Sequence, residues 1–202
     1  SEYCSYFLPA IKPFLTEEFI AKYKNNNLIL KNKDFIEGIN NKLPEDFYEK
    51  RRTGERETYL SELIRNDDVV EFVIYVNKMC LTPQSFIEKS IFETNPLLMF
   101  NENITLIEYA AFFGSIGIIK NLRSKGADLP QRIWEFAIHS ENAELIQYLE
   151  DNKVRLSEDY FEEILFESIK CHHNSISNYI IFNLITEKHL KYNNENVYVR
   201  NL

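Results

Sequence analysis

The residues of this sequence best suited to chemistry lie together near the C-terminal end, at Cys171, His172 and His173. A cysteine and a histidine can act as a nucleophile and its base, and both are common zinc ligands. Adjacent residues on a helix point about 100° apart, however, and no second Cys-His cluster is visible in the sequence to complete four ligands. A hydrolase or metal-binding protein that uses Cys171, His172 and His173 is therefore the alternative hypothesis.

A second motif, the segment GSIG at Gly114–Gly117, has the spacing of a fragment of a phosphate-binding loop. No Lys-Ser/Thr pair follows it and no strand pattern precedes it, so we interpret it as a turn between two helices. Carboxylates such as Glu162 and Glu163 have spacings that are ordinary for a solvated helix face. The sequence therefore predicts no catalytic residue, no metal site and no cofactor.

The elements that position these side chains are predicted to be helices. The chain has 202 residues, of which 45% are apolar and 27% are charged, and it contains only five glycines and six prolines. This small number of turn-forming residues argues against an all-β domain, and most of the remaining residues favour helices. The composition therefore predicts an all-α fold that is large enough to bury a core.

Charge and cysteine usage restrict the partners. The formal net charge of −8 repels phosphate backbones, which argues against nucleic acid as the main partner. The apolar run Phe72–Val76 is far shorter than the roughly 18 residues of a membrane helix, so no membrane partner is expected. The three cysteines, Cys4, Cys80 and Cys171, form no close pair. Their odd number predicts free thiols in a reducing compartment, and we expect a cytoplasmic protein.

A pattern of two short helices recurs along the chain. The segment LIEYAAFFGSIGIIKNL, residues 106–122, is matched 27 positions later by IWEFAIHSENAELIQYL at 133–149. Looser matches lie 46 positions earlier, at 60–76, and 60 positions later, at 166–182. One pair of short helices cannot bury both of its apolar stripes, so neighbouring copies are expected to stack into a solenoid.

Small residues separate and space these helix pairs. Ala110, Ala111 and Ala137 fall where adjacent first helices would pack closely. Gly114 ends the first helix of its pair, and Gly126 supplies a left-handed stop after the second. The positions of these alanines and glycines therefore agree with the recurring pattern of helix pairs.

The segment TLIEYAAFFGSIGIIKNLRSKGAD, Thr105–Asp128, resembles an ankyrin repeat, whose hallmarks are a T-P-L-H-x-A start, a glycine between the helices and a terminal G-A-D. Thr105 occupies the position of the capping threonine. Leu106 replaces the proline and Glu108 the histidine, which is expected to weaken the capping network without removing the helix pair.

The resemblance extends beyond this copy. The segments EKRRTGERETYLSELIRNDDVVEFVIYVNK, SIFETNP, LIEYAAFFGS and IKCHHN are similar to an expanded family of uncharacterised ankyrin-like proteins of parasitic protists. The resemblance implies an ankyrin-like helical-repeat solenoid of about four helix pairs at residues 56–190, and it implies no established activity.

The predicted helix pairs are irregularly spaced compared with the ankyrin period of about 33 residues. The offsets place the third and fourth copies 33 residues apart, the second and third 27 apart, and the first and second 46 apart. The shortest spacing leaves Leu129 and Pro130 to lead directly into the next helix. The longest contains the connection Leu81–Thr105, in which Thr82 and Pro83 are expected to begin a short helix.

The flanking segments show no copy of the pattern. Residues 1–55 are expected to form a helical N-terminal cap, with helices after Thr16 and in KDFIEGI and PEDFYEK, and a separate binding module is the alternative. The charged run EKRRTGER, Glu49–Arg56, is interpreted as a solvated linker, with a nuclear-import or anion-binding patch as the alternative. Residues 191–202 are predicted to be a C-terminal tail.

The ends of the first helices are predicted to line a concave groove that receives a partner protein, as in ankyrin-like stacks. The offsets assign to this row Asn66, Asp67, Phe112, Phe113, His139, Ser140, His172 and His173. A phenylalanine pair flanked by polar groups is typical of an interface anchor, although packing of one ring beneath the Leu81–Thr105 connection is an open alternative. Trp134 is expected in the core.

The neutral-to-acidic lining of this row suits a partner segment that is basic or aromatic. Protonation of His139 or His172 near pH 6 is expected to alter its affinity. We therefore expect a non-catalytic protein-protein interaction module, a scaffold whose partner and oligomeric state the sequence leaves open. A purely structural spacer is a third hypothesis, which requires an occluded groove.

Overall fold

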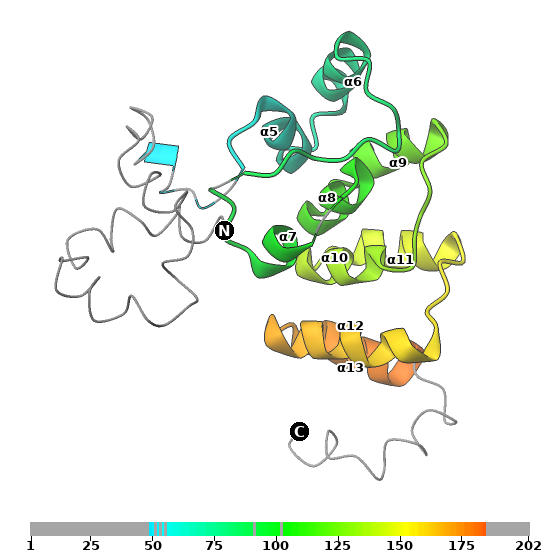
Figure 1. Cartoon of the computed structure of the whole chain (residues 1–202). Coiled ribbons are helices and arrows are strands. Elements are labelled where there is room, and N and C mark those ends of the chain that lie inside the picture. The colour runs from blue at the N-terminus through cyan, green and yellow to red at the C-terminus, as the bar shows by residue number, and fades with distance from the viewer. Residues whose placement is uncertain are drawn as a thin grey trace, which may run out of the picture. The chain divides into compact units, whose positions relative to one another are not determined.

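The computed structural model describes residues 49, 50, 52, 54, 56–90, 92–101 and 103–184, which are coloured in Figure 1. The helices predicted after Thr16 and in KDFIEGI, and the tail predicted at 191–202, lie outside the described residues. The helix predicted in PEDFYEK reaches the described residues Glu49 and Lys50, which are helical. The chain divides into two compact units, one with Ser1–Thr58 and Glu88–Glu102, the other with Tyr59–Ile87 and Asn103–Leu202. The region predicted to form the solenoid, 56–190, therefore includes the segment Glu88–Glu102, which groups with the N-terminal unit.

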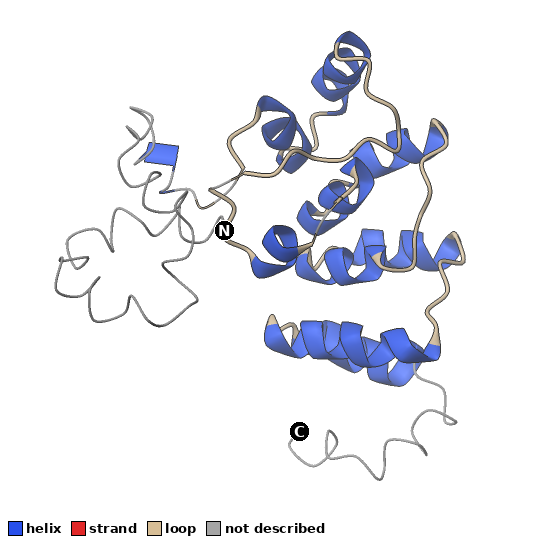
Figure 2. Cartoon of the chain, viewed as in Figure 1, coloured by secondary structure: helices blue, strands red, loops and turns tan. Residues whose placement is uncertain are grey.

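The described residues form helices joined by loops, as Figure 2 shows, together with one isolated antiparallel bridge between Phe86 and Thr105. In chain order the helices are α5 (Tyr59–Arg65), α6 (Val69–Lys78), α7 (Pro96–Phe100), α8 (Leu106–Phe113), α9 (Ile116–Ser124), α10 (Ile133–His139), α11 (Ala143–Asp151), α12 (Glu158–Lys170) and α13 (Asn174–Tyr179). A short π-helical segment, Ile180–Leu184, continues α13. The predicted all-α fold class is confirmed.

The larger unit contains the helix pairs α5–α6, α8–α9, α10–α11 and α12–α13, each joined by a tight turn. One residue of each turn is left-handed, with φ between 49° and 69°: Asp67, Gly114, Glu141 and His172. In every turn the amide of this residue donates to the carbonyl three residues earlier. The turns are 47, 27 and 31 residues apart. The predicted spacing of 27 is confirmed, whereas those of 46 and 33 differ by one and two residues.

The first helices of the pairs pack against one another in sequence order, α5 with α8, α8 with α10 and α10 with α12. Figure 1 shows α8, α10 and α12 as successive layers. Ala110, Ala111 and Ala137 have no exposed surface, as expected for small residues that let adjacent backbones approach. Trp134 is 2% exposed, and its indole Nε1 donates to the Val154 carbonyl at 2.9 Å, so the prediction that it belongs to the core is confirmed.

The connection from α9 to α10 is short, as predicted. Gly126 has φ 93°, and the Ala127 amide donates to the Leu122 carbonyl at 3.0 Å, which closes the end of α9. The Pro130 carbonyl then accepts from the Ile133 amide at 2.9 Å, so a single turn leads from the proline into α10.

The contact between α8 and α10 contains an ion pair whose carboxylate is buried. Thr105 caps α8 and forms a capping box with Glu108, as its position predicted. Glu108 is 1% exposed, and Arg132 binds both of its carboxylate oxygens, through Nε at 2.6 Å and Nη2 at 2.9 Å. Glu108 was expected to weaken the capping network, but it completes the network because its side chain reaches both the cap and Arg132.

The long connection does not form the helix expected after Thr82. Instead the Ser85 amide donates to the Thr82 carbonyl at 3.0 Å and the Thr82 amide donates to Ser85 Oγ at 2.9 Å, which closes a turn. The Ile87 amide then donates to the Ile104 carbonyl at 2.8 Å. These contacts provide hydrogen bonds for backbone amides and carbonyls of an extended segment, in place of the hydrogen bonds within a helix.

The described part of the smaller unit contains a buried arginine. Arg56 is 2% exposed and donates to the carbonyls of Glu88 and Leu98, and its Nε lies 3.4 Å from the Glu93 carboxylate. The interpretation of EKRRTGER as a solvated linker is therefore wrong for Arg56, because backbone carbonyls replace the water around its guanidinium.

Candidate functional site

The residues predicted to line a groove fall into two groups, those whose side chains bond to the backbone and those whose side chains do not. Asp67 belongs to the first group, because its carboxylate accepts from the amides of Gly117 and Ile118 at 2.9 and 2.8 Å. This caps α9 and ties the first helix pair to the second. Gly117 permits the approach, since a Cβ there would lie 2.9 Å from the Asp67 carboxylate. Asn66, next to it, is exposed.

Ser140 and His173 also bond to the backbone. Ser140 Oγ donates to the Ala137 carbonyl at 2.8 Å, and His173 Nδ1 donates to the Ile138 carbonyl at 2.9 Å. His172 is exposed and occupies the left-handed position of its turn, with φ 60°. Within the described part of the chain, neither histidine is hydrogen-bonded to Cys171, so the structure does not assemble the predicted alternative site.

Phe112 and Phe113, at the end of α8, are half-buried and form an aromatic cluster. Their ring centroids lie 4.9 Å apart with the rings edge to face, and Phe113 lies 5.0 Å from Tyr109. The Phe112 ring stacks on the His139 imidazole with a centroid separation of 4.7 Å and an interplanar angle of 27°. Both phenylalanines keep part of their surface accessible, which leaves room for contact with a partner.

The turns give the row a different register from the predicted one. The residues two before each left-handed residue are Arg65, Phe112, His139 and Lys170, and those one before are Asn66, Phe113, Ser140 and Cys171. Relative to the left-handed residue of its turn, Asp67 therefore lies one position, and His172 and His173 lie two positions, after the place predicted for it in this row. Lys170 and Cys171 take the places that had been assigned to the two histidines.

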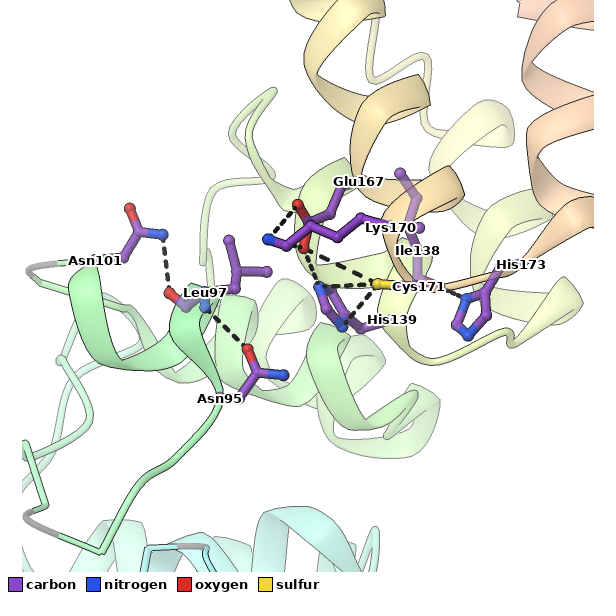
Figure 3. A network of polar contacts seen from close by, with 9 residues as sticks. All are labelled: Asn95, Leu97, Asn101, Ile138, His139, Glu167, Lys170, Cys171 and His173. Atoms are coloured by element: carbon purple, nitrogen blue, oxygen red, sulfur yellow. Dashed lines mark hydrogen bonds and ion pairs between the residues drawn. The ribbon is translucent and has the colours of Figure 1, made fainter. Parts of the chain in front are cut away.

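This register brings His139 of α10, Glu167 of α12 and Cys171 together, as Figure 3 shows. His139 Nε2 lies 2.8 Å from Glu167 Oε1. Cys171 Sγ lies 3.5 Å from His139 Nδ1, 3.7 Å from His139 Nε2 and 4.0 Å from Glu167 Oε1. Lys170 Nζ reaches Glu167 Oε2 at 3.1 Å. We call His139, Glu167 and Cys171 the His-Glu-Cys cluster.

The sequence contained part of the signal for this cluster. Glu167 and Cys171 are four residues apart and so share a helix face, which can be read directly from the sequence. His139 joins them only because α10 packs against α12 in the register set by the turns. Glu167 was not among the predicted site residues.

The protonation states of the cluster do not favour a nucleophile. Burial raises the pKa of the Cys171 thiol, and the nearby Glu167 carboxylate raises it further, so the sulfur keeps its proton at neutral pH. Burial also lowers the pKa of His139 and outweighs its contact with Glu167. The neutral imidazole therefore makes a hydrogen bond with Glu167 and not a charged pair.

An open pocket of about 410 Å³ adjoins the His-Glu-Cys cluster. Its lining comes from α10 and α12 and consists of Glu135, Tyr160, Glu163, Phe166 and Glu167. The Phe166 side chain is 60% exposed. Burial raises the pKa of Glu135, helped by the charge of Glu163 and opposed by a hydrogen bond with Tyr160. The pocket is thus acidic with aromatic walls.

Comparison of the chain with family models, with curated proteins and with solved structures gave no match. Among the described helices, none is long and apolar enough to cross a membrane.

Proposed function

We propose that the chain is an ankyrin-like helical-repeat solenoid of irregular repeat length and that it acts as a non-catalytic protein-protein interaction module. The consecutive packing of the first helices, with alanines between them, supports the solenoid. The free thiols of Cys80 and Cys171 support a reducing compartment such as the cytoplasm.

One observation supports the binding role most directly: a chain of side-chain contacts connects the half-exposed aromatic rings with the open acidic pocket. Phe112 stacks on His139, His139 is bonded to Glu167, and Glu167 lines the pocket. Aromatic anchors beside charged groups are typical of the parts of an interface that contribute most affinity. The proposed docking face therefore comprises Phe112, Phe113 and the pocket.

The partner segment that fits this face is basic and contains an aromatic residue. Glu135, Glu163 and Glu167 attract a lysine or arginine side chain, and the rings of Tyr160 and Phe166 can stack on its cation. An aromatic side chain of the same segment would pack against Phe112 and Phe113. Nucleic acid does not fit a pocket lined by carboxylates.

Binding of the purified full chain to immobilised peptides tests this function. A library of basic-aromatic peptides should contain binders, whereas the same peptides with acidic residues in place of the basic ones should not bind. The double variant Phe112→Ala/Phe113→Ala should weaken binding by about tenfold or more, and Glu163→Gln should reduce its salt dependence.

The matched control is Ile74→Ala, because Ile74 is a 55% exposed apolar residue of α6, outside the proposed docking face. The melting temperatures of all variants should be compared first, so that unfolding is not mistaken for lost binding. Equal binding by the wild type and the double phenylalanine variant would refute the proposed face, and absence of any binder among the basic peptides would refute the partner chemistry.

A further inference from the structure

The His-Glu-Cys cluster offers three donors of different chemistry from two helices. His139 ends α10, Glu167 lies in the last turn of α12, and Cys171 directly follows that helix. One nitrogen, one oxygen and one sulfur atom of these side chains all lie within 4.8 Å of one another. Imidazole and thiolate together select metals of borderline softness and disfavour Mg²⁺ and Ca²⁺, which prefer oxygen ligands only.

The distances between these donors approach those around a tetrahedral zinc ion. Zinc bonds of about 2.0–2.3 Å place neighbouring donors roughly 3.3–3.6 Å apart. The sulfur lies 3.7 Å from His139 Nε2 and 4.0 Å from Glu167 Oε1. His139 Nε2 and Glu167 Oε1 are closer, at 2.8 Å, because they share a proton and no ion. An ion in the place of that proton would widen this contact by about half an ångström.

The surroundings of the cluster are acidic apart from the ammonium of Lys170, which a bound cation would have to displace from Glu167. The His139 and Glu167 side chains are 11% and 12% exposed, so the helices hold both in place. The adjoining pocket contains Glu135 and Glu163, whose charges attract a divalent cation from solvent. Because Glu167 borders both the cluster and the pocket, the pocket supplies an entry path and space for a water in the fourth coordination position.

We propose that His139, Glu167 and Cys171 form a Zn²⁺ site in which water occupies the fourth position. The ion binds His139 Nε2, a Glu167 oxygen and the Cys171 sulfur. The Cys171 thiol gives up its proton to solvent. The imidazole proton, which Nε2 donates to Glu167 in the metal-free protein, moves to Nδ1, so one proton is released for each ion bound. The site joins α10 to α12 and does not depend on the proposed partner.

Zinc titration of the full-length, metal-free protein tests this site, with no partner present. At Zn²⁺ concentrations about a hundredfold above Kd, the melting temperature should rise by about 5–10 °C. Co²⁺ should produce an absorption band characteristic of thiolate ligation. Cys171→Ser and Glu167→Gln should each lower the Zn²⁺ affinity at least about tenfold, and Cys171→Ser should abolish the Co²⁺ band.

Two variants provide matched controls. Cys80→Ser removes an exposed thiol away from the cluster, and His172→Gln removes an exposed imidazole beside Cys171. Both should keep the wild-type Zn²⁺ affinity and the Co²⁺ band. The metal-free melting temperature of each variant shows whether it folds, and Cys171→Ala replaces Cys171→Ser if the serine variant does not.

A wild-type protein whose melting temperature does not respond to Zn²⁺ would overturn the proposal. So would a thiolate band that survives in Cys171→Ser, or one that disappears in His172→Gln, since these would place the metal elsewhere. Because no partner is present, these results are independent of the peptide-binding experiment.

Discussion

The contact between α8 and α10 and the contact between α10 and α12, here called junctions, each contain a glutamate, but the two glutamates differ in their partners. At the α8–α10 junction, the buried carboxylate of Glu108 is held by the Thr105 cap and by Nε and Nη2 of Arg132. At the α10–α12 junction, Glu167 accepts from neutral His139 and from the half-exposed Lys170, and an open pocket adjoins it.

The difference lies in how completely each carboxylate is satisfied by its own fold. Arg132 matches the geometry of a carboxylate with two parallel bonds, and Thr105 donates two more, so four donors of the fold itself bind Glu108. Glu167 is held by groups that can be displaced, because a neutral imidazole and an exposed ammonium bind it less tightly. We therefore expect the first junction to contribute more to stability, and the second is the one that contains the proposed metal site.

Removal of the charge of Glu108 should produce the largest effect on stability. Glu108→Gln removes the charged bonds of a buried carboxylate, although Arg132 is 32% exposed and can be hydrated, so the free energy of unfolding should fall by about 2–3 kcal/mol. Glu167→Gln, at the other junction, should cost only about 1 kcal/mol in the metal-free protein. Urea unfolding measures both.

The control for this comparison is Glu144→Gln, which removes a carboxylate from the exposed ion pair with Lys120 and should leave stability nearly unchanged. Equal losses for Glu108→Gln and Glu167→Gln would show that the two junctions do not differ as described.

The turns that follow α8 and α12 should respond in opposite directions. Gly114 has φ 69°, and a Cβ there would lie 3.1 Å from the Ser140 Cβ, so Gly114→Ala should cost about 1–2 kcal/mol. His172 occupies the same position with φ 60°, and His172→Gly should stabilise by about 0.5–1 kcal/mol. Thermal unfolding of the two variants checks this, and a loss of stability in both would contradict it.

The two junctions should also differ in pH dependence. Burial raises the pKa of Glu108, but the bonds from Arg132 and Thr105 outweigh it, and the net pKa is lowered. Its stabilisation is therefore complete above about pH 4.3, the usual unfolded pKa, and is lost as the pH falls through the folded pKa. The pKa of Glu135 is raised in the folded protein. The stability that Glu135 contributes is therefore present below about pH 4.3 and is lost as the pH rises through its folded pKa.

Unfolding measured from pH 3 to 7 distinguishes these contributions. Glu108→Gln should reduce the decrease in unfolding free energy that occurs as the pH falls. Glu135→Gln should raise the unfolding free energy at pH 7 by about 0.5 kcal/mol and should not change the decrease at low pH. Identical pH profiles for the two variants would remove this contrast.

The smallest predicted effect concerns Lys170, which competes with a metal ion for Glu167. Lys170→Met should tighten Zn²⁺ binding by about two- to fivefold, because both Glu167 oxygens lose their ammonium partner. Zinc titration against the wild type measures the change. Weaker binding in this variant would mean that Lys170 supports the cluster.

Much of the local architecture could be predicted from the sequence. The capping role of Thr105, the left-handed stop at Gly126 and the burial of Trp134 were all expected, and the structure contains them. Each depends on residues a few positions apart or on one side chain's hydrophobicity, and both properties are visible without a three-dimensional model.

The candidate site was less predictable because its members come from different helix pairs. The last copy of the pattern was aligned two residues away from its structural register, since the 13-residue α12 is longer than α8 or α10 and its loose apolar pattern does not fix its end. A shift of even one residue rotates a helical side chain by about 100°. The predicted row therefore named His172 and His173 where Lys170 and Cys171 lie.

By itself the sequence determined that the chain is helical, that its helices come in pairs, and where most of the pairs turn, because periodicity and capping act between near neighbours. Only the tertiary structure decided that Arg56 is buried, that Glu108 is paired with Arg132, and that Cys171 meets His139. These contacts depend on the relative register of helices that are distant in sequence, which no local pattern specifies.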